Sequence, residues 1–181
     1  MGEAKKGRLE VQEILRQNIL SGLSRFGHDG IGVMEFANAS MQSVDGVVLM
    51  NRVRTKRVGW QACLDETVGN KLIGREEWIE EQHWQLSCIK KRGQSGESAS
   101  TIVSDDIADD LVAWFNGDGC MFFRRHGMAN LRIDTNSILV YNDNSDLYQR
   151  RAVFTVKIQV PKEITSERDA VDAIMPDVEP V

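Results

Sequence analysis

The first patterned segment of the chain predicts an amphipathic helix over residues 9–26. Apolar positions recur there at steps of three and four, which places them on one helical face. That face is formed by Val11, Ile14, Leu15, Asn18, Ile19, Gly22, Leu23 and Phe26. Gly27 follows and favours a helix end, because glycine tolerates the left-handed conformation of a helix cap.

From residue 30 to residue 92 the pattern becomes typical of strands. Alternating apolar and polar positions predict strands over residues 31–36, 46–53, 57–64 and 76–90. The longest of these places four side chains on one face: Trp78, Trp84, Leu86 and Cys88. A helix there would need apolar residues near positions 81 and 85, where the chain has Glu and Gln. Residues 67–74 are expected to form a loop or the projecting tip of a hairpin.

The second half of the chain predicts one more helix and four more strands. The helix spans residues 105–116, with Ser104 as its cap and Asp105 and Asp106 in the first turn, where carboxylates favour the helix dipole. Residues 117–119 should end it. Strands are predicted over 120–125, 130–134, 138–141 and 147–160, with a turn at 142–146 and Pro161 as a strand end. The prediction is an α+β fold with an antiparallel β-sheet, two helices packed on one face, and the order α-β(4)-α-β(4).

Length and charge divide the 181 residues into one domain with two extensions. Residues 9–160 form the domain, residues 1–8 a charged amino-terminal arm, and residues 161–181 an acidic tail that can hold a short helix over 166–174. The tail has two bases and six acids, so it carries −4 of the net charge of −5. This balance argues against a protein that wraps DNA, but allows a surface past which DNA slides.

The sequence contains no signal for a membrane or for secretion. No apolar run is long enough to span a bilayer, and the first eight residues lack the apolar core of a secretion signal. We therefore expect a protein made in the cytoplasm that has no membrane partner. Cys63, Cys88 and Cys120 are expected to be reduced and mostly buried thiols.

Candidate chemistry is sparse, and we expect no enzyme, no catalytic residue, no cofactor and no metal. The histidines at 28, 83 and 126 lack metal-ligand spacing. An acidic cluster at 76, 77, 80 and 81 could hold Mg²⁺, but strand alternation sends its members to opposite faces. Asp143 and Asp146 fall in a turn that favours aspartate for backbone reasons. Two alternative functions remain. The acidic pairs would suit a metal-dependent nuclease or hydrolase, and the tryptophans would suit a small peptide- or ligand-binding module.

Aromatic and cationic residues suggest an interface between subunits. Tryptophan and arginine are the residues that most often anchor protein–protein contacts, although core packing is the ordinary role of tryptophan. The candidate interface consists of Trp60, Gln61, Trp78, Glu80, Trp84, Arg124, Arg125, Asp143, Asp146, Tyr148, Arg150 and Arg151.

Four segments together resemble a known family. They are Ile-Leu-x-x-Leu at 19–23, Arg-Val-Gly-Trp-Gln at 57–61, Ser-Asp-Asp-Ile-Ala-Asp-Asp-Leu at 104–111, and Asn-Asp-Asn-Ser-Asp-Leu-Tyr-Gln-Arg-Arg-Ala-Val-Phe-Thr-Val at 142–156. In their order and spacing they resemble phage neck or tail terminator (head–tail joining) proteins over most of residues 9–160. The long acidic tail and the charged amino-terminal arm depart from that family.

The resemblance implies a structural virion protein of the phage neck or collar. Such a subunit forms a homo-oligomeric ring, expected to be a hexamer, between the head–tail connector or adaptor and the tail tube or sheath. DNA would meet it only in transient, non-specific passage through the lumen. We expect the 67–76 tip or a terminal arm to reach the adjacent subunit, and the acidic tail to bind a neck neighbour.

Overall fold

The computed structural model describes residues 8–35, 46–69, 71–90, 104–131, 133, 136–142 and 148–169. Within these residues the chain forms three helices and six strands, and is an α+β protein. The elements are α1 (Arg8–Arg25), β1 (Ile31–Glu35), β2 (Gly46–Val68), β3 (Lys71–Lys90), α2 (Ser104–Asn116), α3 (Asp118–Arg125), β4 (Ala129–Asn130), β5 (Asn136–Asn142) and β6 (Tyr148–Asp169).

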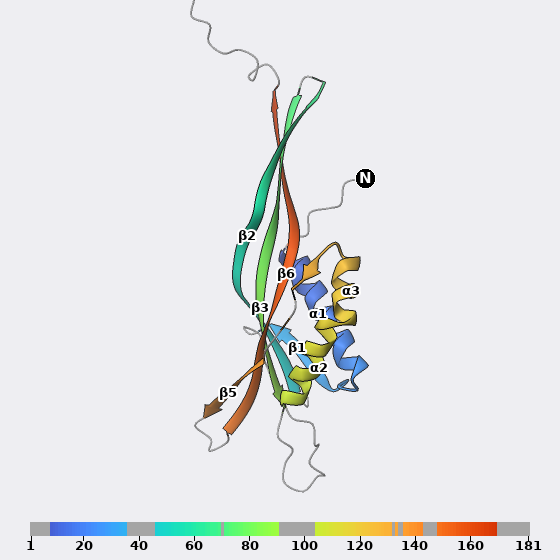
Figure 1. Cartoon of the computed structure of the whole chain (residues 1–181), viewed down its shortest axis with the longest axis vertical. Helices are drawn as coiled ribbons and strands as arrows, with labels where there is room; N and C mark the ends of the chain where they lie inside the picture. Colours follow the sequence, from blue (N-terminus) through green and yellow to red (C-terminus); the bar gives the residue numbers. More distant parts are fainter. Residues whose placement is uncertain are drawn as a thin grey trace, which may run out of the picture.

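The strands form one mixed sheet in the order β1-β2-β3-β6-β4, with β5 also paired to β6. β1 runs parallel to β2, and every other pair is antiparallel. The purely antiparallel sheet predicted from the sequence is therefore wrong in one pair. Figure 1 shows the three helices against one face at one end of the sheet, while β2, β3 and β6 continue far beyond them.

The core lies between the helices and the covered half of the sheet. Trp84, Leu86 and Cys88 of β3 alternate onto this face beside Phe154, Val156 and Ile158 of β6, and all six are buried. Leu15, Ile19 and Leu23 of α1 and Leu111 and Phe115 of α2 close over them. The helical face expected in residues 9–26 thus packs towards the sheet as far as Leu23, as its period requires, but Phe26 lies beyond the end of α1 and is exposed.

The helices are also joined by one buried polar side chain, Asn18. Its amide nitrogen donates to the Gly119 carbonyl at 3.0 Å, and its side-chain oxygen accepts the Trp114 indole N–H at 2.8 Å. Asn18 is fully buried, so these bonds satisfy groups that would otherwise be costly to desolvate. Gly119 has to be glycine, because an added Cβ would lie 2.7 Å from the Trp114 ring and 2.9 Å from its carbonyl oxygen.

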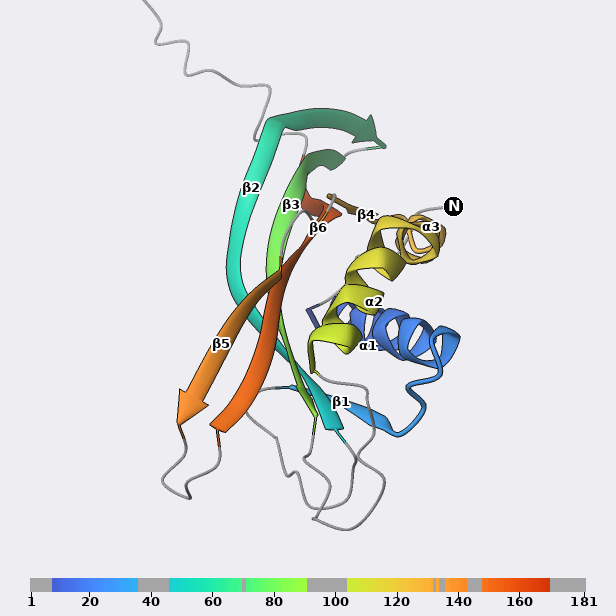
Figure 2. The same cartoon turned by 60° about the horizontal axis from the view of Figure 1, so that its bottom comes forward.

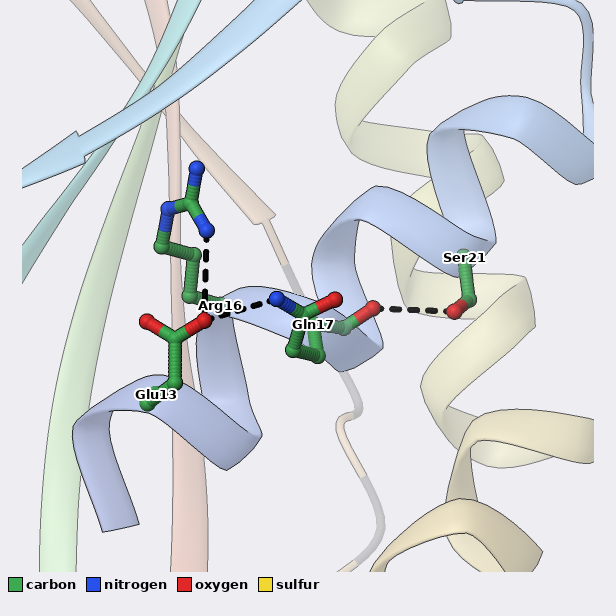
Figure 3. A network of polar contacts seen from close by, with 4 residues as sticks. All are labelled: Glu13, Arg16, Gln17 and Ser21. Atoms are coloured by element: carbon green, nitrogen blue, oxygen red, sulfur yellow. Dashed lines mark hydrogen bonds and ion pairs between the residues drawn. The ribbon is translucent and has the colours of Figure 1, made fainter. Parts of the chain in front are cut away.

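The outer side of the helical layer is polar. On α1, Glu13 accepts hydrogen bonds from Arg16 at 3.2 Å and from Gln17 at 2.7 Å, and Ser21 donates to the Gln17 carbonyl at 2.9 Å (Figure 3). Each contact joins two exposed residues that lie one turn apart on the helix, and such contacts stabilise a helix by only tenths of a kcal/mol.

No helix within the described residues is long and apolar enough to cross a membrane.

The strands predicted over 46–53 and 57–64 form a single strand, β2. Its pairing with β3 has two irregularities, which the sequence pattern does not reveal. One lies between Arg52 and Arg54 and the other between Val58 and Ala62. Gly59 adopts a φ of +80° within the second, which favours glycine. The first irregularity changes which parity of β2 residue lies on the helix side, because Arg52 pairs with Trp84 but Arg54 pairs with His83, whereas the second adds two residues and keeps the parity. The change at residues 52–54 makes the alternation of one continuous strand read as two. Residues 67–68 belong to β2 and residues 71–74 to β3, so the expected tip is the strand-paired end of a hairpin and a loop over these residues is wrong. Gly69 follows β2 with a φ of +64°.

The predicted strand over 120–125 is wrong, because these residues belong to the third helix, α3. Its aromatic and apolar residues are typical of a strand when considered locally, but tertiary packing stabilises a helix here. The Phe123 ring stacks on Phe115 of α2 with centroids 5.9 Å apart. Gly117 separates α2 from α3, which explains why the Gly-Asp-Gly segment indicated only a turn. The two-helix prediction and the order α-β(4)-α-β(4) are corrected accordingly.

β6 continues nine residues past the point where Pro161 was expected to end it. Pro161 pairs with Ile79 on β3, and on its other side no described strand is present. Proline is tolerated there because an edge strand does not need every N–H for its ladder. Residues 161–169 are therefore strand, and a helix from 166 is wrong for them. Residues 1–7 of the charged amino-terminal arm, the turn at 143–146 and the tail beyond 169 lie outside the described residues.

Candidate subunit interface on a three-stranded arm

The sheet extends beyond the helices as a three-stranded segment that we call the arm. It comprises residues 58–68 of β2, 71–79 of β3 and 161–169 of β6. Figure 1 shows it extending beyond α1, α2 and α3, and Figure 2 shows the far end of β2 curving towards the side of the sheet that carries the helices. The buried apolar residues of the described chain all fall outside the arm. Burial against the helices therefore does not explain why these residues fold into such a long projection.

Both margins of the arm are open within the described chain. β1 pairs with β2 only as far as Met50, so the outer edge of β2 has no strand partner from Asn51 to Val68. β4 meets β6 only at Ile158 and Gln159, which leaves the outer edge of β6 open from Val160 to Asp169. Unpaired backbone donors and acceptors on such edges are available to another strand.

The arm also exposes apolar side chains. Eight large hydrophobic residues of the described chain are exposed, and four of them lie on the arm: Leu64, Val68, Ile79 and Ile164. Single exposed hydrophobics are ordinary, and it is their grouping on one projecting element that makes the arm a candidate interaction surface.

Cross-strand ion pairs hold β3 and β6 of the arm together. Arg75 Nε lies 3.1 Å from Glu163 Oε1, and Lys71 contacts Glu167 nearer the tip. On β2, Gln61 donates a hydrogen bond to Glu76 at 2.7 Å. All three contacts are solvent-exposed, so each contributes little to stability and their main effect is to fix neighbouring strands in register.

Trp78 lies half-buried on the arm beneath a cation. The Arg57 guanidinium stands 4.4 Å from the centre of the Trp78 ring, a cation–π contact between β2 and β3. Arg57 is opposite Glu80 in the register, and so diagonal to Trp78 on the same face. Sequence reasoning missed Arg57, and only the register of β2 on β3 could have revealed it. Trp60 is on β2 in the bulge beside Trp78, and its side chain lies outside the description.

A charged network sits at the foot of the arm, on the face opposite the helices. Glu81 of β3 is buried, and its carboxylate contacts Lys56 of β2 at 3.0 Å and the His83 imidazole at 2.7 Å. The His83 hydrogen bond, with further contributions from Lys56 and Gln159, lowers the Glu81 pKa from 4.5 to about 2 against the opposing effect of burial. Glu81 therefore ties all three arm strands together at the point where the helices end.

Most of the remaining candidate residues are distributed away from the arm. Trp84 is 1% exposed and donates its indole N–H to Gln82 at 3.1 Å, so it is a core residue that presents no surface to a partner. Glu80 accepts a hydrogen bond from Gln82 at 2.6 Å. Arg124 and Arg125 are exposed in the last turn of α3, within the helical layer.

The other predicted interface residues lie near β5. Tyr148, Arg150 and Arg151 are in β6 and pair with Asn142, Val140 and Leu139 of β5, and their side chains are outside the description. Asp143 and Asp146 fall outside the described residues altogether. The structure thus brings together Trp60, Gln61, Trp78 and Glu80, which share the arm or its foot, and separates them from the α3 and β5 groups.

The geometry offers little to a metal or a small ligand. Glu76 and Glu80 share one face of β3 and Glu77 and Glu81 the other, as expected from alternation. Among the described residues no three His, Cys, Asp or Glu side chains are placed to share a metal ion. A shallow pocket of about 110 Å³ lies on the arm between Cys63, Leu72 and Ser166. Ligand sites usually measure roughly 300 Å³ or more.

The three cysteines are free thiols, but they differ in exposure. Cys88 is buried in the core, and burial raises its pKa to about 12, which makes it unreactive. Cys120 is half-buried. Cys63 is exposed on the arm, so the prediction that the thiols are mostly buried is wrong for this one.

No protein-family model matches this chain, and no curated protein matches it in sequence.

Proposed function

We propose that this chain is a structural subunit of a homo-oligomeric ring at the phage neck or tail terminus. In this role it joins the head connector to the tail tube or sheath and surrounds the path of the DNA. It acts by assembly and not by catalysis. The observation that carries the proposal is the arm, a long three-stranded projection with two open edges and exposed apolar side chains.

An arm of this kind is best explained by contacts outside the chain. Two- and three-stranded ribbons with both faces in water are marginal by themselves. Long open edges also expose a monomer to uncontrolled pairing, which proteins normally prevent by shortening or covering them. A neighbouring subunit that covers the arm accounts for its length, its open edges and its exposed Leu64, Val68, Ile79 and Ile164.

A ring follows more naturally from this shape than a two-fold dimer. The open edges of the arm belong to different strands, β2 on one side and β6 on the other. When two unlike surfaces form the contact, an assembly of several copies still has one free β2 edge at one end and one free β6 edge at the other. Copies therefore continue to add until the rotation between neighbours closes the assembly into a ring. The number six comes from the family resemblance, and not from the shape of the arm.

The partners in this proposal are the connector or adaptor on the head side and the tube or sheath on the tail side. DNA passes transiently and without sequence recognition, in keeping with the net charge of −5 of the chain. The acidic residues after Asp169 are proposed to contact a neck neighbour. Residues 161–169 are part of the arm, so a truncation that tests the tail has to begin after Asp169 and not at Pro161.

Particle mass and particle shape test the proposal directly. Light scattering of the purified full chain should give a discrete multiple of the 20.4-kDa chain, and negative-stain images should show closed rings with a central hole. If rings form only on the connector or on a tail tube, the same images of those mixtures should show them. A chain that remains a monomer both alone and with these partners contradicts the proposal.

A further inference from the structure

We propose that neighbouring arms join edge to edge: residues 62–68 of β2 pair, in parallel, with residues 160–169 of β6 from a second copy. One sheet then continues from subunit to subunit around the ring. This inference rests on the proposed ring and adds which edges meet, in which direction and over which residues.

The direction of pairing follows from the topology. β2 and β6 are both antiparallel to β3, so they run parallel to each other, from the foot of the arm to its tip. In a ring all copies point the same way, which places the β2 edge of one copy beside the β6 edge of the next, also in parallel. Each added copy pairs through one of its two edges, β2 or β6, and leaves its other edge free for the next copy.

The span of pairing follows from the regularity of β2. From Ala62 to Val68 its register against β3 is unbroken, residue for residue. Nearer the body the edge is interrupted by the two bulges and lined by Arg52, Arg54, Lys56 and Arg57. Bulges and cations are the features that keep a sheet edge from accepting another strand. Residues 62–68, about 23 Å of strand at 3.3 Å per residue, are the longest regular stretch of this open edge; the other, residues 54–58, is shorter and contains three cations.

Charge favours β6 over a second β2 as the occupant. Residues 62–68 contain Asp65 and Glu66 and no base, so an antiparallel pairing of β2 with another β2 would bring these acids together. On β6, Glu163 and Glu167 are already neutralised by Arg75 and Lys71 of the same copy. The rest of that segment contains Lys162, Arg168 and Asp169, so it has no excess of acid.

The native Cys63 allows a direct test by disulfide cross-linking. Cys63 is exposed on the open edge, and it faces the same side of the sheet as Ile164, with which it shares a register level through Glu76. In a continuous sheet, Cys63 of one copy should therefore lie beside an even-numbered β6 residue of the next. Disulfides need Cβ atoms about 4 Å apart, so only residues on the same face can react readily.

The experiment uses the full chain with Cys120→Ser as background, since Cys88 is buried and unreactive. To this background we would add Ile164→Cys or Ser166→Cys, with Thr165→Cys as the opposite-face control and Cys63→Ser as the thiol control. After mild oxidation with copper phenanthroline in air, denaturing gels without reductant separate covalent species by size. Light scattering of the same samples before oxidation reports whether rings are present.

The proposed pairing predicts a ladder of covalent dimers, trimers and higher species from position 164 or 166. It also predicts several-fold less product from position 165 and none after Cys63→Ser. Dimers formed through Cys63 alone would show β2 paired with β2 and overturn the inference. So would equal yields at 164, 165 and 166, or rings that do not cross-link at any of them. In these cases the ring itself still stands, whereas samples without any ring by light scattering would reject the proposed function.

Discussion

Removing the arm should leave a folded body, because none of the arm side chains that the structure describes is a buried apolar residue. A short-arm variant can be cut at one register level, where Ala62, Glu77 and Glu163 lie side by side on the three strands. It lacks residues 63–76, which are replaced by Asn-Gly as a two-residue hairpin turn, and it ends at Glu163. All four tryptophans remain as fluorescence probes.

The expected loss of stability is small and can be bounded from the contacts removed. The cut breaks the exposed ion pairs Lys71–Glu167 and Arg75–Glu163, worth about 0–1 kcal/mol each. The ladder hydrogen bonds lost are exposed to water, and their small net gain is offset by the chain entropy of ordering the strands. The free energy of unfolding should fall by no more than about 2 kcal/mol.

Urea unfolding followed by tryptophan fluorescence and far-UV circular dichroism measures this difference. The matched control is Trp84→Ala with a full-length arm, which removes a core side chain and should cost about 3–5 kcal/mol. The slope against urea should also decrease in the short-arm variant, because less surface is exposed on unfolding. A short-arm variant as unstable as Trp84→Ala would refute the view that the arm lies outside the cooperative core.

Two further substitutions test the polar contacts of the body and of the foot of the arm. Asn18→Ala should lower the free energy of unfolding in urea by about 1–3 kcal/mol, because the Gly119 carbonyl loses its buried donor and the Trp114 indole keeps only the backbone carbonyl of residue 18, at 3.1 Å. A change below about 0.5 kcal/mol would contradict the role given to Asn18. Glu81 has a folded pKa of about 2, below its ordinary 4.5, so its stabilising effect is present above pH 4.5 and is lost as the pH falls towards 2. The stability difference between the wild type and Glu81→Gln should therefore shrink over that range, and a constant difference would speak against the network.

The sequence pattern was sufficient to predict an element where its apolar residues repeat with one unbroken period and all pack into the core. α1 follows from apolar residues such as Leu15, Ile19 and Leu23, and the body half of β3 from Trp84, Leu86 and Cys88, because each set packs on a single surface. α3 could not be predicted in the same way. Its helical state depends on Phe123 meeting Phe115 of α2 and on Gly119 fitting beneath Trp114, which are tertiary contacts.

The arm itself depends on pairings that the sequence does not reveal. The bulges of β2 interrupt its alternation, and Pro161 indicates an end to a strand that continues because its outer edge is open. The candidate interface was predictable only in part for the same reason. Trp78 and Trp84 share a strand and a parity, yet the helices cover only Trp84, so one is core and the other lies on the arm.

The central claim is that this chain functions as one of many identical copies in a closed ring. The measurement that tests it most directly is the mass of the particle by light scattering, read together with negative-stain images of the same sample. For a hexamer the mass should be six times the 20.4-kDa chain, with a central hole in each particle, and the short-arm variant should fall to the mass of a single chain. A full-length chain that stays at 20.4 kDa at every concentration and beside its neck partners would contradict the account, as would intact rings formed without the arm.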